Sequence, residues 1–386
     1  MKETSTSPLN SLVSHYDTAS FSIERFQGPP PELIYLVPGI MPLGTAGTLY
    51  GTGGTGKSII ALSLSIQVAI AHKIQSKWLG AYPIETGGLV AYFSAEDSED
   101  ELHRRVHGLC GAIGKANGLT GEEVQNLSKD NLRLVNLWGS GTTLFKSGSL
   151  EPTAEYRRIR KTLDRLKRRG HVRLIVIDTR SLLSGIEGGG NAAVAKEVSY
   201  YQKMARDYKA TVLIVHHTNK AGSASADNPA MAVRGEAAFL DNLRFGIYLN
   251  SVPLDDIDVT HAHDPMSYTK LTVSKLNYGK MPSPIIICRD GYWFSTENTK
   301  APVTPVSKKE KTRQKNMDQV LSIIRQTPNI SQQDVITAAK ATSRISAKRC
   351  REALEKLDEV QMISFQVGER GVKRYFVVEE EYGCAA

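Results

Sequence analysis

The chain contains the glycine-rich sequence Gly51-Thr52-Gly53-Gly54-Thr55-Gly56-Lys57-Ser58 between a predicted strand and a predicted helix. It fits the pattern GxxxxGK[ST] at every position. Glycines let a loop turn its backbone N–H groups toward an anion, and the N-terminus of a following helix adds to that attraction. The lysine supplies a positive charge for the β- and γ-phosphates, and the serine hydroxyl is a ligand for Mg²⁺. The stretch predicts a nucleotide site formed by these eight residues and Ile59.

The sequence around this loop alternates between short apolar runs and longer helical patterns. Buried strands are expected at 47–50, 88–93, 132–137, 174–177, 211–215, 244–249, 270–273 and 284–288. Helices are expected at 57–72, 99–113, 153–168 and 192–208. Such alternation predicts an α/β fold with a mainly parallel, twisted sheet flanked by helices. The later runs have shorter connections, so we expect an antiparallel edge.

Carboxylates follow two of the predicted strands. Asp178 ends the apolar run that begins at Arg173, and ligands of open α/β sheets bind at the carboxyl ends of the strands. We expect Asp178 to hold the Mg²⁺ shell with Ser58, although an Asp at this position also caps strands. Glu96 follows another strand end and is the candidate base for the attacking water. Asp97 orients Glu96 or, like Glu96 itself, is an acid that favours a helix start.

A pair of histidines, His216 and His217, ends the strand predicted at 211–215. Their rings come to the same edge of the sheet, so one of them is expected to sense the γ-phosphate. Which of the two does so stays open, and a histidine bonded to a backbone carbonyl is the alternative.

Composition excludes several classes of protein. With no run of 18 apolar residues, a membrane-spanning helix is not expected. The polar start, Met1–Asn10, does not resemble a secretory signal. The four cysteines show no CxxC spacing, which argues against a zinc module and a disulfide scaffold and suits the reducing cytoplasm. The net charge of +8 favours an anionic partner such as nucleic acid.

Six segments together resemble the RepA-type hexameric replicative helicases of mobile plasmids, within the RecA-like ATPases. The resemblance covers about Leu33 to Phe294. The segments are GTLYGTGGTGKS (47–58), VAYFSAED (90–97), LIVIDTRSL (174–182), LIVHHTNK (213–220), RGEAAFLDNLRFGIYL (234–249) and VSKLNYGK (273–280). The resemblance implies a RecA-like core that assembles as a homo-hexameric ring, with ATP and Mg²⁺ between neighbouring subunits and single-stranded DNA in the hole.

The resemblance also implies roles for individual residues. An arginine of the neighbouring subunit completes the family's site, and Arg244 matches it. Lys275 lies where related helicases place a second cation, although their K-x-R is Lys-Leu-Asn here. Arg234 is a weaker candidate for either role. The loop that starts at Asn219 corresponds to one that lines the DNA channel, so Lys220 would meet phosphates unless the loop is an ordinary surface loop.

The chain continues beyond the predicted core. We expect an irregular lead-in at 1–32, the ATPase core at 33–298, a basic linker at 299–315 and a small α+β domain at 316–380. Helices at 318–326, 332–339 and 347–357, with strands at 362–367 and 373–378, resemble a winged helix-turn-helix.

Basic residues gather in this last domain. From Ala301 to Ala386 there are 15 Lys or Arg residues and 11 Asp or Glu residues. The candidates for DNA contacts around the third helix and the hairpin are Arg344, Lys348, Arg349, Arg351, Arg370 and Lys373. Such domains also bind proteins, so a replication protein is the alternative partner.

The sequence therefore predicts an ATP-dependent DNA helicase or translocase that acts in the replication of a plasmid, a phage or another mobile element. A RecA-like regulatory or recombination ATPase that unwinds nothing is one alternative. Another is a winged-helix DNA-binding regulator whose ATPase core sets the oligomeric state. A metabolic phosphate-loop kinase is the weakest alternative, since such an enzyme has no use for the basic C-terminal region.

Overall fold

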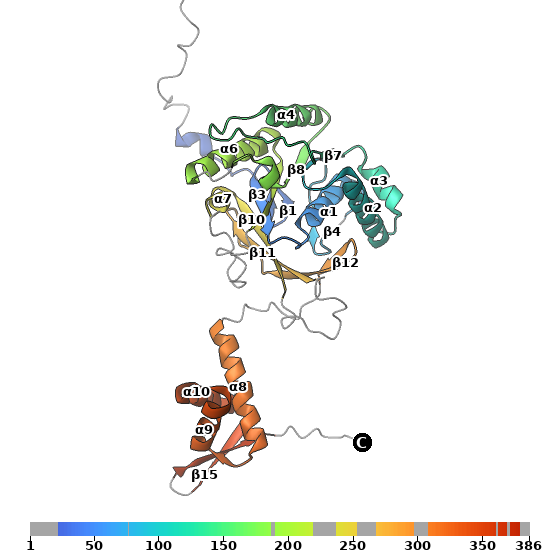
Figure 1. Cartoon of the computed structure of the whole chain (residues 1–386). Helices are drawn as coiled ribbons and strands as arrows, with labels where there is room; N and C mark the ends of the chain where they lie inside the picture. The colour runs from blue at the N-terminus through green and yellow to red at the C-terminus, as the bar shows by residue number, and fades with distance from the viewer. Residues whose placement is uncertain are drawn as a thin grey trace, which may run out of the picture. The chain divides into compact units, whose positions relative to one another are not determined.

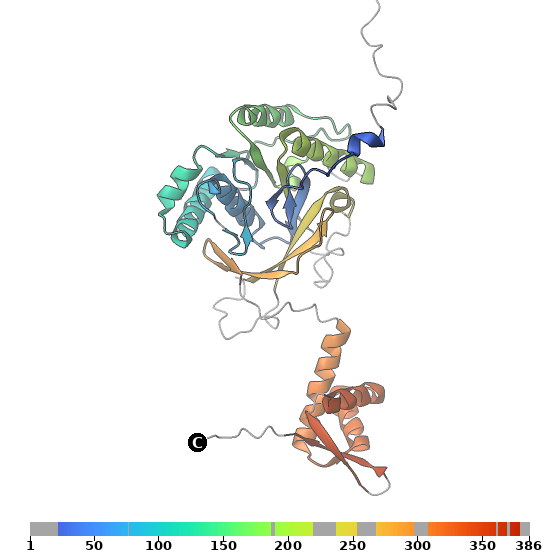
Figure 2. The same ribbon diagram turned by 180° about the vertical axis from the view of Figure 1, so that it is seen from behind.

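The computed structural model describes residues 22–75, 77–186, 190–218, 237–252, 268–296, 308–359, 362–368 and 371–378. The chain divides into two compact units, Met1–Lys300 and Ala301–Ala386. Figures 1 and 2 show the elements of each unit from opposite sides. Within the described residues, no helix is long and apolar enough to cross a lipid bilayer.

A nine-stranded sheet forms the centre of the first unit, in the order β13-β12-β11-β10-β3-β9-β8-β6-β7. Strands β10, β3, β9, β8, β6 and β7 are parallel, and β10 to β13 are joined by antiparallel pairs. The bounds are β3 (Ala46–Gly51), β6 (Leu89–Ser94), β7 (Leu132–Asn136), β8 (Val172–Asp178), β9 (Thr211–His217), β10 (Phe245–Ser251), β11 (Tyr268–Leu276), β12 (Ile285–Asp290) and β13 (Trp293–Thr296). The mostly parallel sheet and its antiparallel edge are as predicted.

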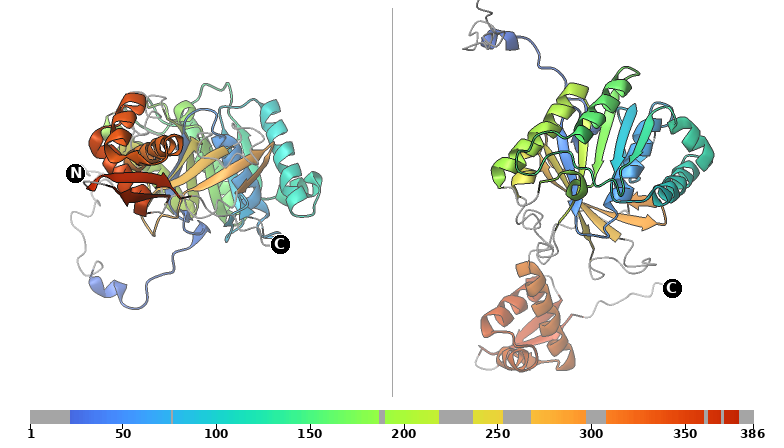
Figure 3. Two further views of the ribbon diagram at one scale, coloured as in Figure 1. Left: turned by 90° about the horizontal axis from the view of Figure 1, so that it is seen from below. Right: turned by 45° about the horizontal axis from the view of Figure 1, so that its top comes forward.

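Two groups of helices cover the two faces of the sheet, as the right view of Figure 3 shows. One face packs against α1 (Lys57–Ile70), α2 (Glu99–Ala116) and α3 (Gly121–Ser128). The other packs against α4 (Ala154–Lys167), α5 (Arg180–Leu183), α6 (Asn191–Tyr208) and α7 (Ala237–Asn242). The central strands are buried on both faces, which explains why they read as continuous apolar runs instead of alternating patterns.

Short elements complete the first unit. They are a single 3₁₀ turn η1 (Ile23–Phe26), β1 (Tyr35–Val37) paired with β2 (Met41–Pro42), and β4 (Lys77–Trp78) paired with β5 (Tyr82–Pro83). The side chain of Trp78, on β4, is fully buried and donates its indole N–H to the Ile60 carbonyl of α1 at 3.2 Å. This contact ties the β4–β5 hairpin to the helix that follows the phosphate loop.

The described residues of the second unit form three helices and a three-stranded antiparallel sheet of order β14-β16-β15. Its elements are α8 (Lys308–Gln326), β14 (Ile330–Ser331), α9 (Gln332–Ser343), α10 (Ala347–Glu359), β15 (Ile363–Val367) and β16 (Lys373–Val377). Buried side chains from all three helices and the sheet form one core. The predicted start of α9 is confirmed, because the Ser331 hydroxyl accepts the Asp334 N–H at 3.2 Å.

Several elements differ from the sequence-based expectation. The helix expected from Asp318 begins at Lys308, inside the stretch expected to be a linker. Helices α3, α5 and α7 and strand β13 were not predicted. Helices α5 and α7 and strand β13 have six residues or fewer, so each is too short to show a repeating apolar pattern in the sequence.

Candidate nucleotide site

The phosphate loop joins β3 to α1 at the carboxyl edge of the sheet. Gly56 has φ of 81° and begins α1 in a left-handed conformation that a glycine adopts without strain. A Cβ on Gly51 would lie 2.2 Å from the Leu249 carbonyl oxygen of β10, so a side chain does not fit there. Both glycines are thus required by the backbone, independently of any ligand.

Lys57 is 3% exposed, and its ammonium donates to the Thr52 carbonyl at 2.6 Å, within the loop. Burial lowers the pKa of Lys57 from 10.5 to about 8, and the negative charges of Glu96 and Asp178 oppose this shift. An anion bound in the loop would stabilise the charged lysine further.

Asp178 and Ser58 meet as predicted. Asp178 is fully buried at the end of β8, and its Oδ1 accepts a hydrogen bond from Ser58 Oγ at 3.1 Å. Its Oδ2 accepts the hydroxyl of Tyr92, on the neighbouring strand β6. Burial raises the pKa of Asp178 to about 6, although both hydrogen bonds act in the opposite direction. A carboxylate and a hydroxyl in contact are oxygen ligands of the kind that Mg²⁺ prefers, so these two residues fit the ion.

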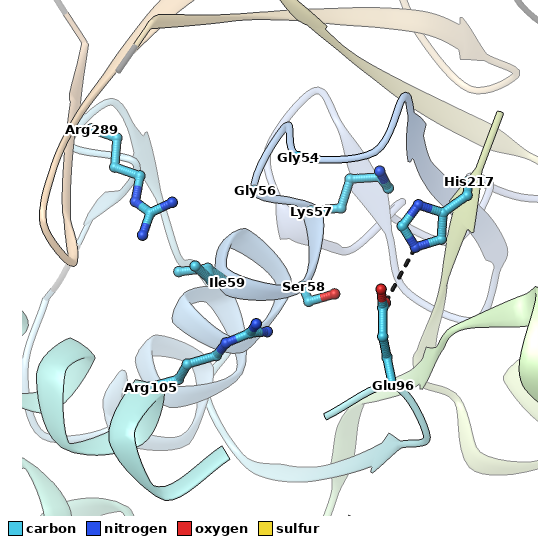
Figure 4. Close-up of a pocket in the computed structure, with 9 residues that line it drawn as sticks. All are labelled: Gly54, Gly56, Lys57, Ser58, Ile59, Glu96, Arg105, His217 and Arg289. Atoms are coloured by element: carbon cyan, nitrogen blue, oxygen red, sulfur yellow. Dashed lines mark hydrogen bonds and ion pairs between the residues drawn. The ribbon is translucent and has the colours of Figure 1, made fainter. Parts of the chain in front are cut away.

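Glu96 and His217 also come together, at the ends of β6 and β9. Glu96 Oε2 lies 3.2 Å from His217 Nε2 (Figure 4). The hydrogen bond with His217 holds the pKa of Glu96 below its usual value, and partial burial opposes this effect. Glu96 is therefore ionised at neutral pH, as a residue that accepts a proton must be. Asp97, next to it, is bound by Arg105 of α2 instead.

One cavity of about 230 Å³ collects most of these groups (Figure 4). It is lined by Gly54, Gly56, Lys57, Ser58, Ile59, Glu96, Arg105, His217 and Arg289. Sequence reasoning missed Arg105 and Arg289. Arg289 lies on β12 with the period of two that also places Ile287 on that face, and Arg105 lies on α2 four residues after its partner Glu101. Both patterns were visible, but neither indicates a ligand.

The structure distinguishes the two histidines. His217 is half-buried and lines the cavity, whereas His216 is 4% exposed and meets the ring of Phe239 edge-on, with 5.6 Å between ring centroids. Burial lowers the pKa of His216 to about 3, so its imidazole is neutral at physiological pH. Of the two, His217 is the one in a position to contact a nucleotide in this cavity.

The two predicted trans-acting cations lie at the opposite edge of the sheet from the phosphate loop. The Arg244 N–H donates to the carbonyl of Ala46, the first residue of β3, whereas the loop begins at Gly51, the last. Five residues of strand separate the two levels by roughly 16 Å. Lys275 Nζ donates to the carbonyls of Leu240, at 3.1 Å, and Asp241, at 2.5 Å, at the end of α7. Neither cation reaches the site of its own chain.

The remaining predicted residues fall in two groups. Arg344, Lys348, Arg349, Arg351 and Lys373 lie in the second unit and are exposed. Lys220, Arg234 and Arg370 lie outside the described residues.

A comparison with known protein families gives one match, to a family described as "AAA domain", over residues 14–223. This match covers more than half of the chain. The chain belongs to the AAA domain family. The matched residues of this AAA domain include the phosphate loop, Glu96, Asp178 and both histidines. Membership of the family implies that the chain binds a nucleotide.

Among solved structures, the chain is similar to one described as an ATPase domain, with a TM-score of 0.48 and 14% identity over 72% of this chain and 95% of that one. It is also similar to "The Structure Of A DnaB-Like Replicative Helicase And Its Interactions With Primase", with a TM-score of 0.49 and 13% identity over 72% of this chain and 65% of that one.

Proposed function

We propose that the chain hydrolyses ATP as a subunit of a homo-hexameric DNA helicase that acts in the replication of a plasmid, a phage or another mobile element. The observation that carries the proposal is the cavity in which Lys57, Ser58, Glu96 and His217 meet. In it, the loop amides and Lys57 would bind the phosphates. Glu96 would orient a water molecule for attack on the γ-phosphate and accept its proton, and ADP and phosphate would leave.

Ser58 and Asp178 would hold Mg²⁺ in this reaction. The ion would neutralise charge on the β- and γ-phosphates. Asp178 has to lose its proton before it acts as a ligand, so its raised pKa makes metal binding weaker below about pH 6.

The position of Arg244 supports a shared site. In many phosphoryl-transfer enzymes an arginine stabilises the charge that develops on the γ-phosphate. Arg244 is exposed and lies at the far edge of the sheet from its own phosphate loop. It would therefore complete the site of a neighbouring subunit, as in the RepA-type helicases that the sequence resembles. Six copies arranged in this way would enclose single-stranded DNA, with Lys220 among its contacts.

The second unit would be a winged-helix domain, and duplex DNA is its proposed partner. Three helices with a three-stranded sheet fit that domain, and α10 begins with basic side chains that are exposed. In helix-turn-helix domains, the N-terminal end of the recognition helix contacts base edges in the major groove. The basic side chains of α10 would lie at this end. In this organisation residues 33–298 form the ATPase core, after a lead-in at 1–32. A basic linker would end before Lys308, where α8 begins the second domain.

The test is ATP turnover by the full chain with and without single-stranded DNA, followed by a forked-duplex unwinding assay. Lys57→Ala serves as the inactive control. The proposal predicts that single-stranded DNA stimulates turnover and that strands separate only when ATP is hydrolysed. Stimulated turnover without strand separation would favour a regulatory or recombination ATPase. Negligible turnover, with tight binding of one duplex sequence, would favour a DNA-binding regulator.

A further inference from the structure

Phe239, on α7, contacts both strand ends that flank the nucleotide site. Its side chain is 2% exposed. The guanidinium of Arg180 lies 4.1 Å from the centroid of its ring, and the imidazole of His216 meets the ring at 61°. These are favourable geometries for a cation on an aromatic face and for an edge-to-face ring pair.

Each of these two neighbours is tied to a residue of the site. Arg180 follows Asp178 by two residues, and His216 precedes His217, which bonds Glu96. A change at either strand end that accompanies nucleotide binding or phosphate release would therefore reach the ring of Phe239.

Arg180 is fixed from the other side by α6. Its Nη2 and Nε donate to the Glu197 carboxylate at 2.8 Å and 3.1 Å, and the hydroxyl of Tyr201 donates to the same carboxylate at 3.3 Å. Glu197 is fully buried. Apolar residues often stabilise a core as well as a buried ion pair does, so the pair is better explained by a need for one defined geometry.

The other end of α7 leads to Arg244. Gln202 Nε2 donates to the Asn242 carbonyl at 2.7 Å, and Lys275 binds the last carbonyls of the helix. Arg244 follows two residues after Asn242. Burial lowers the pKa of Lys275, and the nearby charge of Arg244 lowers it further against the opposing charge of Asp241. Helix α7 is thus held at Phe239 by chain neighbours of the site residues Asp178 and His217, and at its C-terminal end by the surroundings of Arg244.

We propose that Phe239 is a positioning residue that makes the placement of Arg244 depend on the nucleotide bound in its own subunit. This inference rests on the proposed function, because Arg244 must serve a neighbouring site. Each subunit would then supply an effective arginine in one nucleotide state and a misplaced one in another. Hydrolysis at successive sites of the ring would be coupled through α7.

The experiment uses mixed oligomers. Acceptor subunits carry Arg244→Ala and keep an intact nucleotide site. Donor subunits keep Arg244 and carry either Lys57→Ala, which prevents nucleotide binding, or Glu96→Gln, which binds ATP without turnover. The turnover of a mixture then reports how well the donor's Arg244 serves the acceptor. We expect the two donors to differ by roughly fivefold or more, a common size of coupling between sites.

Phe239→Leu in both donors should abolish this difference, because leucine fills much of the space but offers no aromatic face to Arg180 or His216. Leu163→Ala, in the same core but on α4, controls for a general loss of stability and should leave the difference intact. The inference would be overturned if the two donors with Phe239 intact restored equal turnover to the acceptor. It would also be overturned if their difference persisted with Phe239→Leu. No rescue by either donor would instead contradict the shared site of the proposed function.

Discussion

The two edges of the parallel sheet carry different parts of the proposed ATPase site. At the carboxyl edge, the phosphate loop, Asp178, Glu96 and His217 follow four neighbouring strands. The loop, Glu96 and His217 line one cavity, and Asp178 accepts a hydrogen bond from Ser58 of the loop. At the opposite edge, Arg244 and Lys275 lie beside the end of α7. The first edge holds the groups proposed to bind a nucleotide and activate water. The second holds the exposed Arg244 and the partly buried Lys275. The separation teaches that one chain contains every part of the proposed site but does not assemble them in one place.

The largest effect on ATP turnover is expected from Arg244, at the edge of the sheet opposite the phosphate loop. Arg244→Ala should lower ATP turnover by about 10³-fold or more, because an arginine at the γ-phosphate contributes about 10³ to 10⁵ in rate. Nucleotide affinity should change little, and fluorescent-nucleotide binding measures this alongside turnover. Arg157→Ala, at an exposed arginine of α4, is the matched control. A turnover for Arg244→Ala close to that of this control would remove the second edge from the reaction.

The first edge is tested by Glu96→Gln. Glutamine keeps an oxygen that accepts from His217 but cannot take a proton, so turnover should fall by about 10²- to 10⁴-fold while ATP still binds. Single-turnover hydrolysis and nucleotide binding separate the two steps. If the variant hydrolyses ATP at the wild-type rate, another group acts as the base.

The buried carboxylate of Asp178, at the phosphate-loop edge, is expected to lower the stability of the folded protein. The pKa of Asp178 rises from 3.8 to about 6, so folding favours its neutral form. The resulting destabilisation is complete above about pH 6 and disappears as the pH falls toward 3.8. Asp178→Asn removes the charge and should raise the free energy of unfolding at pH 8 by up to about 3 kcal/mol while it impairs metal-dependent turnover.

Urea unfolding of the nucleotide-free protein at pH 8 and pH 5 measures this effect. The gain in stability should be smaller at pH 5 than at pH 8. A variant that is less stable than the wild type at pH 8 would show that the hydrogen bonds from Ser58 and Tyr92 outweigh the burial of the charge.

The smallest effect is expected from a substitution of Lys275, and it distinguishes this lysine from Arg244. Because Lys275 binds the last carbonyls of α7, Lys275→Met should reduce the free energy of unfolding by about 1 kcal/mol and lower turnover less than Arg244→Ala does. Thermal unfolding and turnover are compared for the two variants. A loss of turnover as large as that of Arg244→Ala, at unchanged stability, would make Lys275 a nucleotide-binding cation, as its sequence position suggests.

Much of this comparison was predictable from the sequence. Local patterns located β3, β6, β8 and β9, and the rule that ligands bind at the carboxyl edge brought Asp178, Glu96 and the histidines to the phosphate loop. Because the side chain of His216 packs under α7 and that of His217 points into the cavity, their different roles depend on tertiary contacts.

Other parts of the site carry no local signal. Arg289 enters the cavity only because β12 folds back along β11, and Arg105 only because α2 packs beside α1. Tyr92 reads as one more apolar strand residue, although its hydroxyl bonds Asp178. Helix α7 is six residues long, so its place between the histidines and Arg244 could not be anticipated from periodicity.

The most direct test of the account is complementation between two inactive variants. Lys57→Ala lacks a working nucleotide site but keeps Arg244, and Arg244→Ala keeps the site but lacks the arginine. Each variant alone should show negligible ATP turnover. If neighbouring subunits share sites, mixing the two should restore turnover, with a maximum at intermediate ratios. A mixture that stays as inactive as its components, both with Lys57→Ala and with Glu96→Gln as the subunit that supplies Arg244, would contradict the claim that neighbouring subunits share sites, provided that the oligomer is shown to form at the concentrations used.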